Sequence, residues 1–171
     1  MAFLYRRGPQ DFFQIGRVNE IRETQYGTAN GGHIWYPGVS TCTTITLLLA
    51  NGSAIGMHLT KLDLAGDVDA IVTQMNVVRG VTAVSSMYAV GVLMCRSMDG
   101  WMAESRFRWP TQLTTFNTAF GRNAGDIVHG YIQKESTGAK DYRVLIGGGG
   151  VSWFERTSGT QTWSALDLKA L

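Results

Sequence analysis

The pattern of hydrophobic and polar positions along the chain predicts mostly strands. The strongest signal is a β-hairpin: residues 39–49 are dense in β-branched side chains, Asn51-Gly52 forms a preferred two-residue turn, and residues 53–60 continue the pattern. Strand-like runs also occur elsewhere, at 14–21, 33–36, 87–95, 127–133, 142–146, 151–156 and 161–166. We expect Pro37-Gly38 to end the strand at 33–36, and a turn at 98–100 to lead into the segment 101–107.

Two segments have helical spacing instead. The first helix is predicted over 66–79, with Asp67 near its start, Gly80 just after its end, and a hydrophobic face of Val68, Ile71, Val72, Met75 and Val78. The second is predicted to begin at Pro110 and to end at Gly121, with a face of Leu113, Phe116, Ala119 and Phe120.

About eight strands and two helices favour an α+β protein, a β-sandwich core flanked by helices, over a doubly wound parallel sheet. The chain shows no internal repeat and no linker, so we expect a single domain over 1–171. Hydrophobic residues make up 44% of the sequence and charged residues 16%, which is typical of a compact folded protein.

The charge of the chain argues against several classes of partner. The formal net charge is +2 and the basic residues form no run, so we expect no nucleic-acid or membrane partner. We also expect a monomer. The longest apolar stretch, around 45–50, is far too short to span a bilayer. Arg6 and Arg7 follow apolar residues, the reverse of the order in a secretory signal, so we expect no signal peptide and two free thiols, Cys42 and Cys95.

Candidate chemistry centres on Cys42 and His58. Cys42 follows the Pro37-Gly38 turn, and such a turn can leave backbone N–H groups free to form an oxyanion hole. With the hairpin turn at Asn51-Gly52, Cys42 lies opposite a position near 61, within a few residues of His58. A neighbouring imidazole can take the thiol proton and produce a nucleophile. The alternative is that Cys42 is simply a small buried hydrophobic residue.

A resemblance favours the catalytic interpretation. The segments Ser40-Thr41-Cys42-Thr43-Thr44-Ile45 and Met57-His58-Leu59-Thr60-Lys61 resemble the Cys-His core of the cytotoxic necrotizing factor type of deamidase. The same arrangement is similar to that of the chemoreceptor deamidase CheD and of Burkholderia lethal factor. The resemblance covers residues 39–61.

This resemblance implies a β-sandwich flanked by helices that deamidates glutamine side chains of a protein partner without a cofactor. Cys42 would attack the carboxamide, ammonia would leave, and water would hydrolyse the thioester, with His58 as the base. Its members in the CheD and lethal factor group orient the histidine with a threonine about six residues before the cysteine, where this chain has Tyr36. Tyr36 could orient His58 through its hydroxyl or backbone carbonyl, or could simply pack. Thr28 and Thr60 are weaker candidates.

Toxin resemblance implies synthesis in a bacterial cytoplasm and delivery into a host cell or secretion by a dedicated system, whereas a CheD-like enzyme would act on chemoreceptors inside the producing cell. The same pair could also serve transglutaminase, amidase or peptidase chemistry. A further alternative is a non-enzymatic β-rich binding module, such as a phage or secretion-apparatus component, with a buried, inert Cys42.

Other candidate sites have weaker signals. His33, His58 and His129 could be imagined as metal ligands with a cysteine, but none of the short spacings typical of zinc sites is present, so we expect no metal. The glycines at 147–150 lack the Lys-Ser or Lys-Thr of a phosphate loop and favour a hairpin turn.

Overall fold

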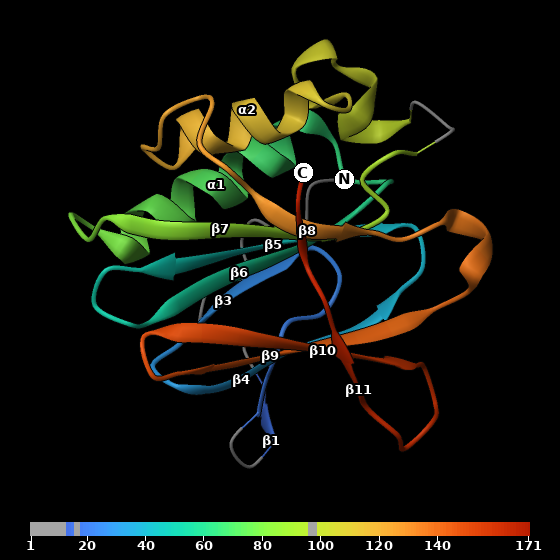
Figure 1. The fold of residues 1–171 in the computed structure, drawn as a ribbon. Helices are drawn as coiled ribbons and strands as arrows, with labels where there is room; N and C mark the ends of the chain where they lie inside the picture. Colours follow the sequence, from blue (N-terminus) through green and yellow to red (C-terminus); the bar gives the residue numbers. More distant parts are fainter. Residues whose placement is uncertain (1–12, 16–17, 96–98) are drawn as a thin grey trace.

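The protein is a two-sheet sandwich with both helices on one side. The computed structural model describes residues 13–15, 18–95 and 99–171, and shows two six-stranded sheets facing each other (Figure 1). Helices α1 (Ala65–Arg79) and α2 (Thr111–Ala119) lie over the outer face of one sheet, while the other sheet has no helix over it in the described part of the chain (Figure 1). The predicted α+β sandwich flanked by helices is confirmed.

The sheet away from the helices, sheet A, is antiparallel except where β2 runs parallel to β4. Its strands, in spatial order, are β1 (Phe13–Ile15), β2 (Val18–Glu20), β4 (Gly32–Val39), β9 (Lys140–Gly147), β10 (Gly150–Thr157) and β11 (Ser164–Leu166).

The sheet beneath the helices, sheet B, contains the predicted hairpin at its centre. Its strands, in spatial order, are β12 (Lys169–Ala170), β8 (His129–Ile132), β7 (Val84–Gly91), β5 (Cys42–Leu49), β6 (Ala54–Thr60) and β3 (Gln25–Ala29). The chain crosses from sheet A to sheet B between β2 and β3, between β4 and β5, and between β11 and β12.

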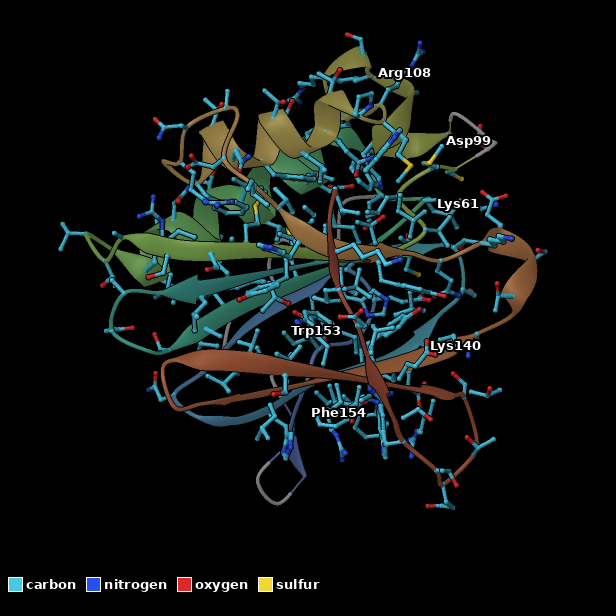
Figure 2. All side chains as sticks on the ribbon, in the orientation of Figure 1. Lys61, Asp99, Arg108, Lys140, Trp153 and Phe154 are labelled. Carbon is cyan, nitrogen blue, oxygen red and sulfur yellow. The ribbon has the colours of Figure 1, made fainter. Side chains whose placement is uncertain are left out.

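Two hydrophobic cores follow from this arrangement, because successive side chains of a strand point to opposite faces. One core lies between sheet B and the helices, where Ile45 and Met57 meet Phe116. The other lies between the sheets and includes Tyr36, Cys42 and Trp153. Figure 2 shows Trp153 between the sheets and its neighbour Phe154 on the far side of sheet A.

Both predicted helices are confirmed. The Asp67 carboxylate accepts a hydrogen bond from the Leu64 backbone N–H at 3.0 Å, which satisfies a donor at the start of α1. Gly80 ends α1 with φ of +57°, a conformation that glycine adopts without strain. The predicted segment 101–107 consists of two 3-10 helices, η2 (Gly100–Ala103) and η3 (Ser105–Phe107), and a third, η4 (Glu135–Thr137), follows β8.

Several strand boundaries differ from the predicted ones: the run expected as one strand at 14–21 contains two strands, β1 and β2, that pair with each other, and β8 and β11 begin later than expected. Pro37-Gly38 does not end β4: the strand continues to Val39 through a bulge at which Gly38 has φ of +66°. The strand predicted at 87–95 begins at Val84 and ends at Gly91, so Cys95 lies outside it. Parts of the expected strand at 14–21 and turn at 98–100, and the amino-terminal residues 1–12, lie outside the described residues.

Candidate active site

The hairpin register places Cys42 and His58 on one face of sheet B. Thr44 pairs directly with His58, and Cys42 pairs with Thr60, within one position of the predicted partner. Cys42 and Thr44 are two residues apart on one strand, so their side chains share the face that looks toward sheet A. Cys42 and His58 are therefore diagonal neighbours across two paired strands.

The His58 ring is completely buried, with 0% exposure, and is hydrogen-bonded through one of its two nitrogens. Its Nδ1 lies 3.1 Å from the backbone carbonyl oxygen of Ile21. Burial lowers the pKa of His58 to about 4, outweighing the hydrogen bond to Ile21, which acts in the opposite direction. The ring is therefore neutral near pH 7, with the proton on Nδ1, and Nε2 keeps its lone pair without a partner among the described residues.

The Cys42 thiol is 1% exposed and donates a hydrogen bond to Oε1 of Glu23, with an Sγ to Oε1 distance of 3.6 Å. Burial raises the pKa of Cys42 to about 12, and the Glu23 carboxylate adds to the shift. Backbone hydrogen bonds from Ser40 and Thr41 favour the thiolate but are outweighed. The thiol is therefore protonated in this state, and backbone donors lie beside it.

The connection from β2 to β3 contacts both Cys42 and His58. Ile21 bonds the His58 ring, Glu23 bonds the Cys42 thiol, and the Thr24 backbone N–H donates to the His58 carbonyl oxygen at 2.6 Å. Thr24 has φ of +57°, the left-handed region that side chains other than glycine adopt at a cost. Neither Ile21, at the end of the strand expected at 14–21, nor Glu23 belongs to a sequence motif that would mark it as a site residue.

Tyr36 contacts His58, but its hydroxyl bonds elsewhere. The Tyr36 ring meets the His58 ring edge-on, with 6.1 Å between centroids, and stacks on Trp153. Its hydroxyl lies 2.6 Å from Oγ1 of Thr46. The atom that orients the imidazole is thus the Ile21 carbonyl oxygen, and Tyr36 packs against the ring.

The two threonines considered as substitutes for Tyr36 have other contacts. Thr60 Oγ1 accepts a hydrogen bond from the Leu62 backbone N–H at 3.1 Å. Thr28 is in β3, paired with Ile55, three residues beyond the pair that Gln25 makes with His58.

Acidic side chains lie beside the hairpin end that carries Cys42. Asp63 is buried and accepts a hydrogen bond from the Thr60 backbone N–H at 2.8 Å. Burial raises the pKa of Asp63 to about 6, against the effect of its hydrogen bonds and with smaller contributions from Asp67 and Glu23. Glu23 therefore adds to the upward pKa shifts of both Cys42 and Asp63, although burial is the larger cause for each.

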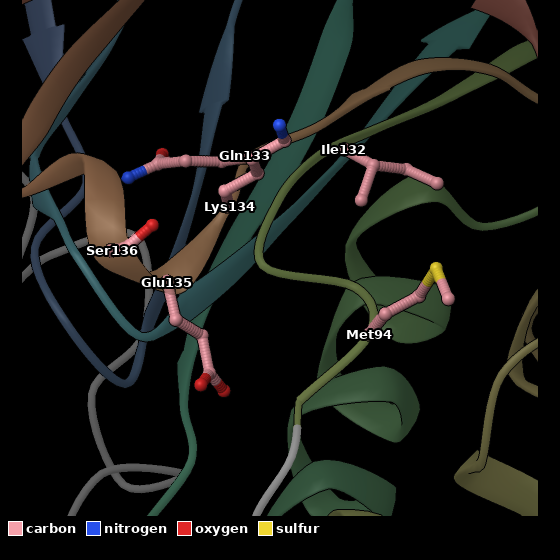
Figure 3. A pocket seen from close by; sticks show the side chains of 6 residues that line it. All are labelled: Met94, Ile132, Gln133, Lys134, Glu135 and Ser136. Atoms are coloured by element: carbon pink, nitrogen blue, oxygen red, sulfur yellow. The ribbon is translucent and has the colours of Figure 1, made fainter.

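A pocket of about 740 Å³ opens near β8 and η4 (Figure 3). It is lined by Met94, Ile132, Gln133, Lys134, Glu135 and Ser136, and therefore by neither member of the Cys42 and His58 pair. Gln133 is buried and connects the pocket to the site: its Nε2 donates to the carbonyl oxygens of Val39 and Gly138, and its Oε1 accepts from the Tyr142 hydroxyl. Val39 precedes Cys42 by three residues.

The remaining candidates do not join this site. His129 is exposed on β8 beside Tyr88, and His33 is half-buried on β4, where burial and Arg143 lower its pKa. Neither Cys95 nor Cys42 forms a disulfide with another described residue; Cys95 packs against the helix-side core, and Cys42 lies in the core between the sheets. Gly147 and Gly150 pair across the β9 and β10 hairpin, the turn expected there.

Within the described ranges, no three His, Cys, Asp or Glu side chains form a group that could hold a metal ion. Neither α1 nor α2, nor any other described helix, is long and apolar enough to cross a membrane. A scan against protein-family models and a search of curated proteins give no match to this chain.

Proposed function

We propose that the protein is a cysteine-dependent hydrolase that deamidates glutamine side chains of a protein substrate, with Cys42 as nucleophile and His58 as base. The observation that carries the proposal is the hairpin register, which makes the two residues diagonal neighbours on one face. The Ile21 carbonyl supports it further, because it occupies Nδ1 and leaves Nε2 as the basic nitrogen.

In the proposed reaction, Nε2 of His58 takes the thiol proton as Cys42 Sγ bonds to the carboxamide carbon. The oxyanion is stabilised by backbone donors at Ser40 and Thr41, which already hydrogen-bond to the sulfur. The C–N bond breaks, and ammonia leaves with the proton from His58. Water then attacks the thioester, giving its proton to His58. The thiolate departs from the glutamate product and recovers that proton.

The burial of the Cys42 thiol sets a requirement for this reaction. Cys42 is 1% exposed and its thiol donates to Glu23, so in the proposed mechanism the substrate approaches the sulfur beside the Glu23 carboxylate. Glu23 is an exposed residue, and a substrate group that replaces the thiol as the donor to its carboxylate removes a hydrogen bond that raises the Cys42 pKa. Substrate entry and thiol activation are therefore one step in the proposed mechanism.

The alternative function is a non-enzymatic β-rich binding module in which Cys42 is an inert core residue. Its 1% exposure and its pKa of about 12 favour this alternative. Cys42 also belongs to the core between the sheets, together with Tyr36 and Tyr142, as a structural cysteine would.

Mass spectrometry of host-cell proteins can decide between the two. Cells expressing the wild type should contain a protein in which one glutamine has gained about one dalton, the difference between an amide and an acid. Cys42→Ser keeps a similar volume but removes the thiol nucleophile, and cells expressing it should lack the change. Cys95→Ser is the matched control and should retain it. Identical target proteins in wild-type and Cys42→Ser cells would favour the binding module.

A further inference from the structure

We propose that Glu23 is the residue that selects a carboxamide over a carboxylate at the Cys42 site. This inference rests on the proposed function, because it concerns the group that Cys42 would attack. The carboxylate of Glu23 lies against the attacking atom itself, with its Oε1 3.6 Å from Sγ of Cys42. A hydrogen-bond donor that approaches this carboxylate therefore competes with the thiol itself.

The position of Glu23 is fixed by its neighbours along the chain. The Thr24 backbone N–H bonds the His58 carbonyl oxygen at 2.6 Å, and the Arg22 backbone N–H bonds Oε1 of Gln25 at 2.9 Å. Gln25 in turn pairs with His58 in the ladder between β3 and β6. Glu23 is thus held between two residues that are both anchored next to His58, and its approach to Cys42 is built into the turn.

The chemistry of the two substrate groups differs where they would meet Glu23. A carboxamide has an NH₂ group that can donate to a carboxylate oxygen, and in doing so it replaces the thiol as the donor to Glu23. A carboxylate has no hydrogen to donate and carries the same charge as Glu23. The site therefore attracts the glutamine side chain by its amide nitrogen, the atom that leaves as ammonia, and repels the glutamate product.

Two alkylating reagents of nearly equal size test this discrimination directly at the sulfur. Iodoacetamide carries a neutral carboxamide and iodoacetate carries a carboxylate. Their rate constants at Cys42 are measured by mass spectrometry of the peptides of the intact, folded protein, with Cys95 read in the same sample. We expect Glu23→Gln to lower the iodoacetamide to iodoacetate rate ratio at Cys42 about fivefold to tenfold, the effect of removing one nearby charge.

The controls separate charge from structure. Glu23→Asp keeps the carboxylate and should keep most of the discrimination. Glu104→Gln removes another exposed carboxylate, one that pairs with Arg106, and should leave the ratio unchanged. The ratio at Cys95 should be the same in all variants.

A ratio at Cys42 that is unchanged in Glu23→Gln overturns the inference, as does a wild-type Cys42 that neither reagent modifies. The inference and the proposed function can fail separately. If Glu23→Gln changes the ratio but His58→Gln leaves the iodoacetamide rate unchanged, Glu23 discriminates at this thiol while His58 is not its base.

Discussion

His58 lies directly opposite Thr44, and this pair places His58 one diagonal step from Cys42 on the face of sheet B that looks toward sheet A. The opposite face of the same strands carries Ile45 and Met57, which pack beneath the helices. A change of one residue in the register would turn the histidine into the helix-side core. The loop at residues 50–52, one residue longer than the predicted Asn51-Gly52 turn, sets the observed register and is thus a determinant of the site; the predicted two-residue turn would have paired His58 with Ile45.

The pH dependence of the His58 contribution should lie at unusually acidic pH. Because burial lowers the pKa of His58 to about 4, the ring is an unprotonated base throughout the neutral range. We expect the ratio of the Cys42 alkylation rates in wild type and His58→Gln to be constant from about pH 7 to 5, and to fall toward one as pH falls through about 4. Taking the ratio removes the titration of the thiol itself. A midpoint near pH 6.5 would show that the imidazole is solvated.

The same histidine should make the fold sensitive to acid. His58 has a pKa near 6.5 in the unfolded chain and about 4 in the folded protein, so between these values the unfolded chain binds more protons. Stability from this group is fully present above about pH 6.5 and is lost as pH falls toward 4, by about 2–3 kcal/mol.

Urea unfolding at pH 7.5 and pH 4.5 checks this. Asp63, whose pKa is raised to about 6, contributes in the opposite direction over part of the same range, so the comparison has to be made with a variant that keeps Asp63. His58→Gln should lose less stability between the two pH values than the wild type. Equal losses would count against a buried neutral imidazole.

Gly56 should be intolerant of any side chain. A Cβ at Gly56, next to Met57 on β6, would overlap the Tyr36 hydroxyl, which is itself bonded to Thr46. We expect Gly56→Ala to lower the free energy of unfolding by about 2–4 kcal/mol through this overlap and the loss of a buried hydrogen bond. Gly66→Ala, in α1 with open space around it, should instead be neutral or stabilising by up to about 1 kcal/mol. Chemical denaturation of both variants measures the contrast.

The buried amide of Gln133 should depend on Tyr142. Removing the hydroxyl in Tyr142→Phe leaves Oε1 of Gln133 without the donor that now lies at 2.7 Å, inside the core between the sheets. We expect a loss of about 1–2 kcal/mol in unfolding free energy, the cost of an unpaired buried acceptor. Tyr131→Phe, at a half-buried position, serves as the control and should change stability by less than about 0.5 kcal/mol. Similar losses in both variants would contradict this role for Gln133.

The parts of the fold that the sequence predicts are those determined by neighbouring residues. An Asn-Gly turn between β-branched segments determines the β5 and β6 hairpin, and helical spacing between Asp67 and Gly80 determines α1. Pro37-Gly38 has the local pattern of a turn. In the folded chain β9 pairs with β4 on both sides of it, at Tyr36 and at Val39, so tertiary pairing outweighs the local preference.

The site is predictable only in part, for the same reason. Cys42 and His58 belong to one hairpin, which local rules predict, but the face on which His58 lies depends on a register that differs by one residue from the predicted one. Glu23 is 19 positions from Cys42, and Ile21 is 37 positions from His58. Their contacts depend on how the two sheets come together, and no spacing within the sequence encodes that arrangement. The proposed activity remains a prediction that rests on the hairpin residues and the segment they resemble.

The passage of the chain from sheet A to sheet B at residues 21–25 has a consequence for the order in which the protein matures. The β5 and β6 hairpin is built from neighbouring residues, whereas the Ile21 carbonyl and the Glu23 carboxylate contact it from the connection between β2 in sheet A and β3 in sheet B. In a chain whose central hairpin has formed before the rest, the Cys42 thiol therefore lacks its contact with Glu23, and the His58 ring lacks the Ile21 carbonyl that fixes its tautomer. Both contacts form when the two sheets come together.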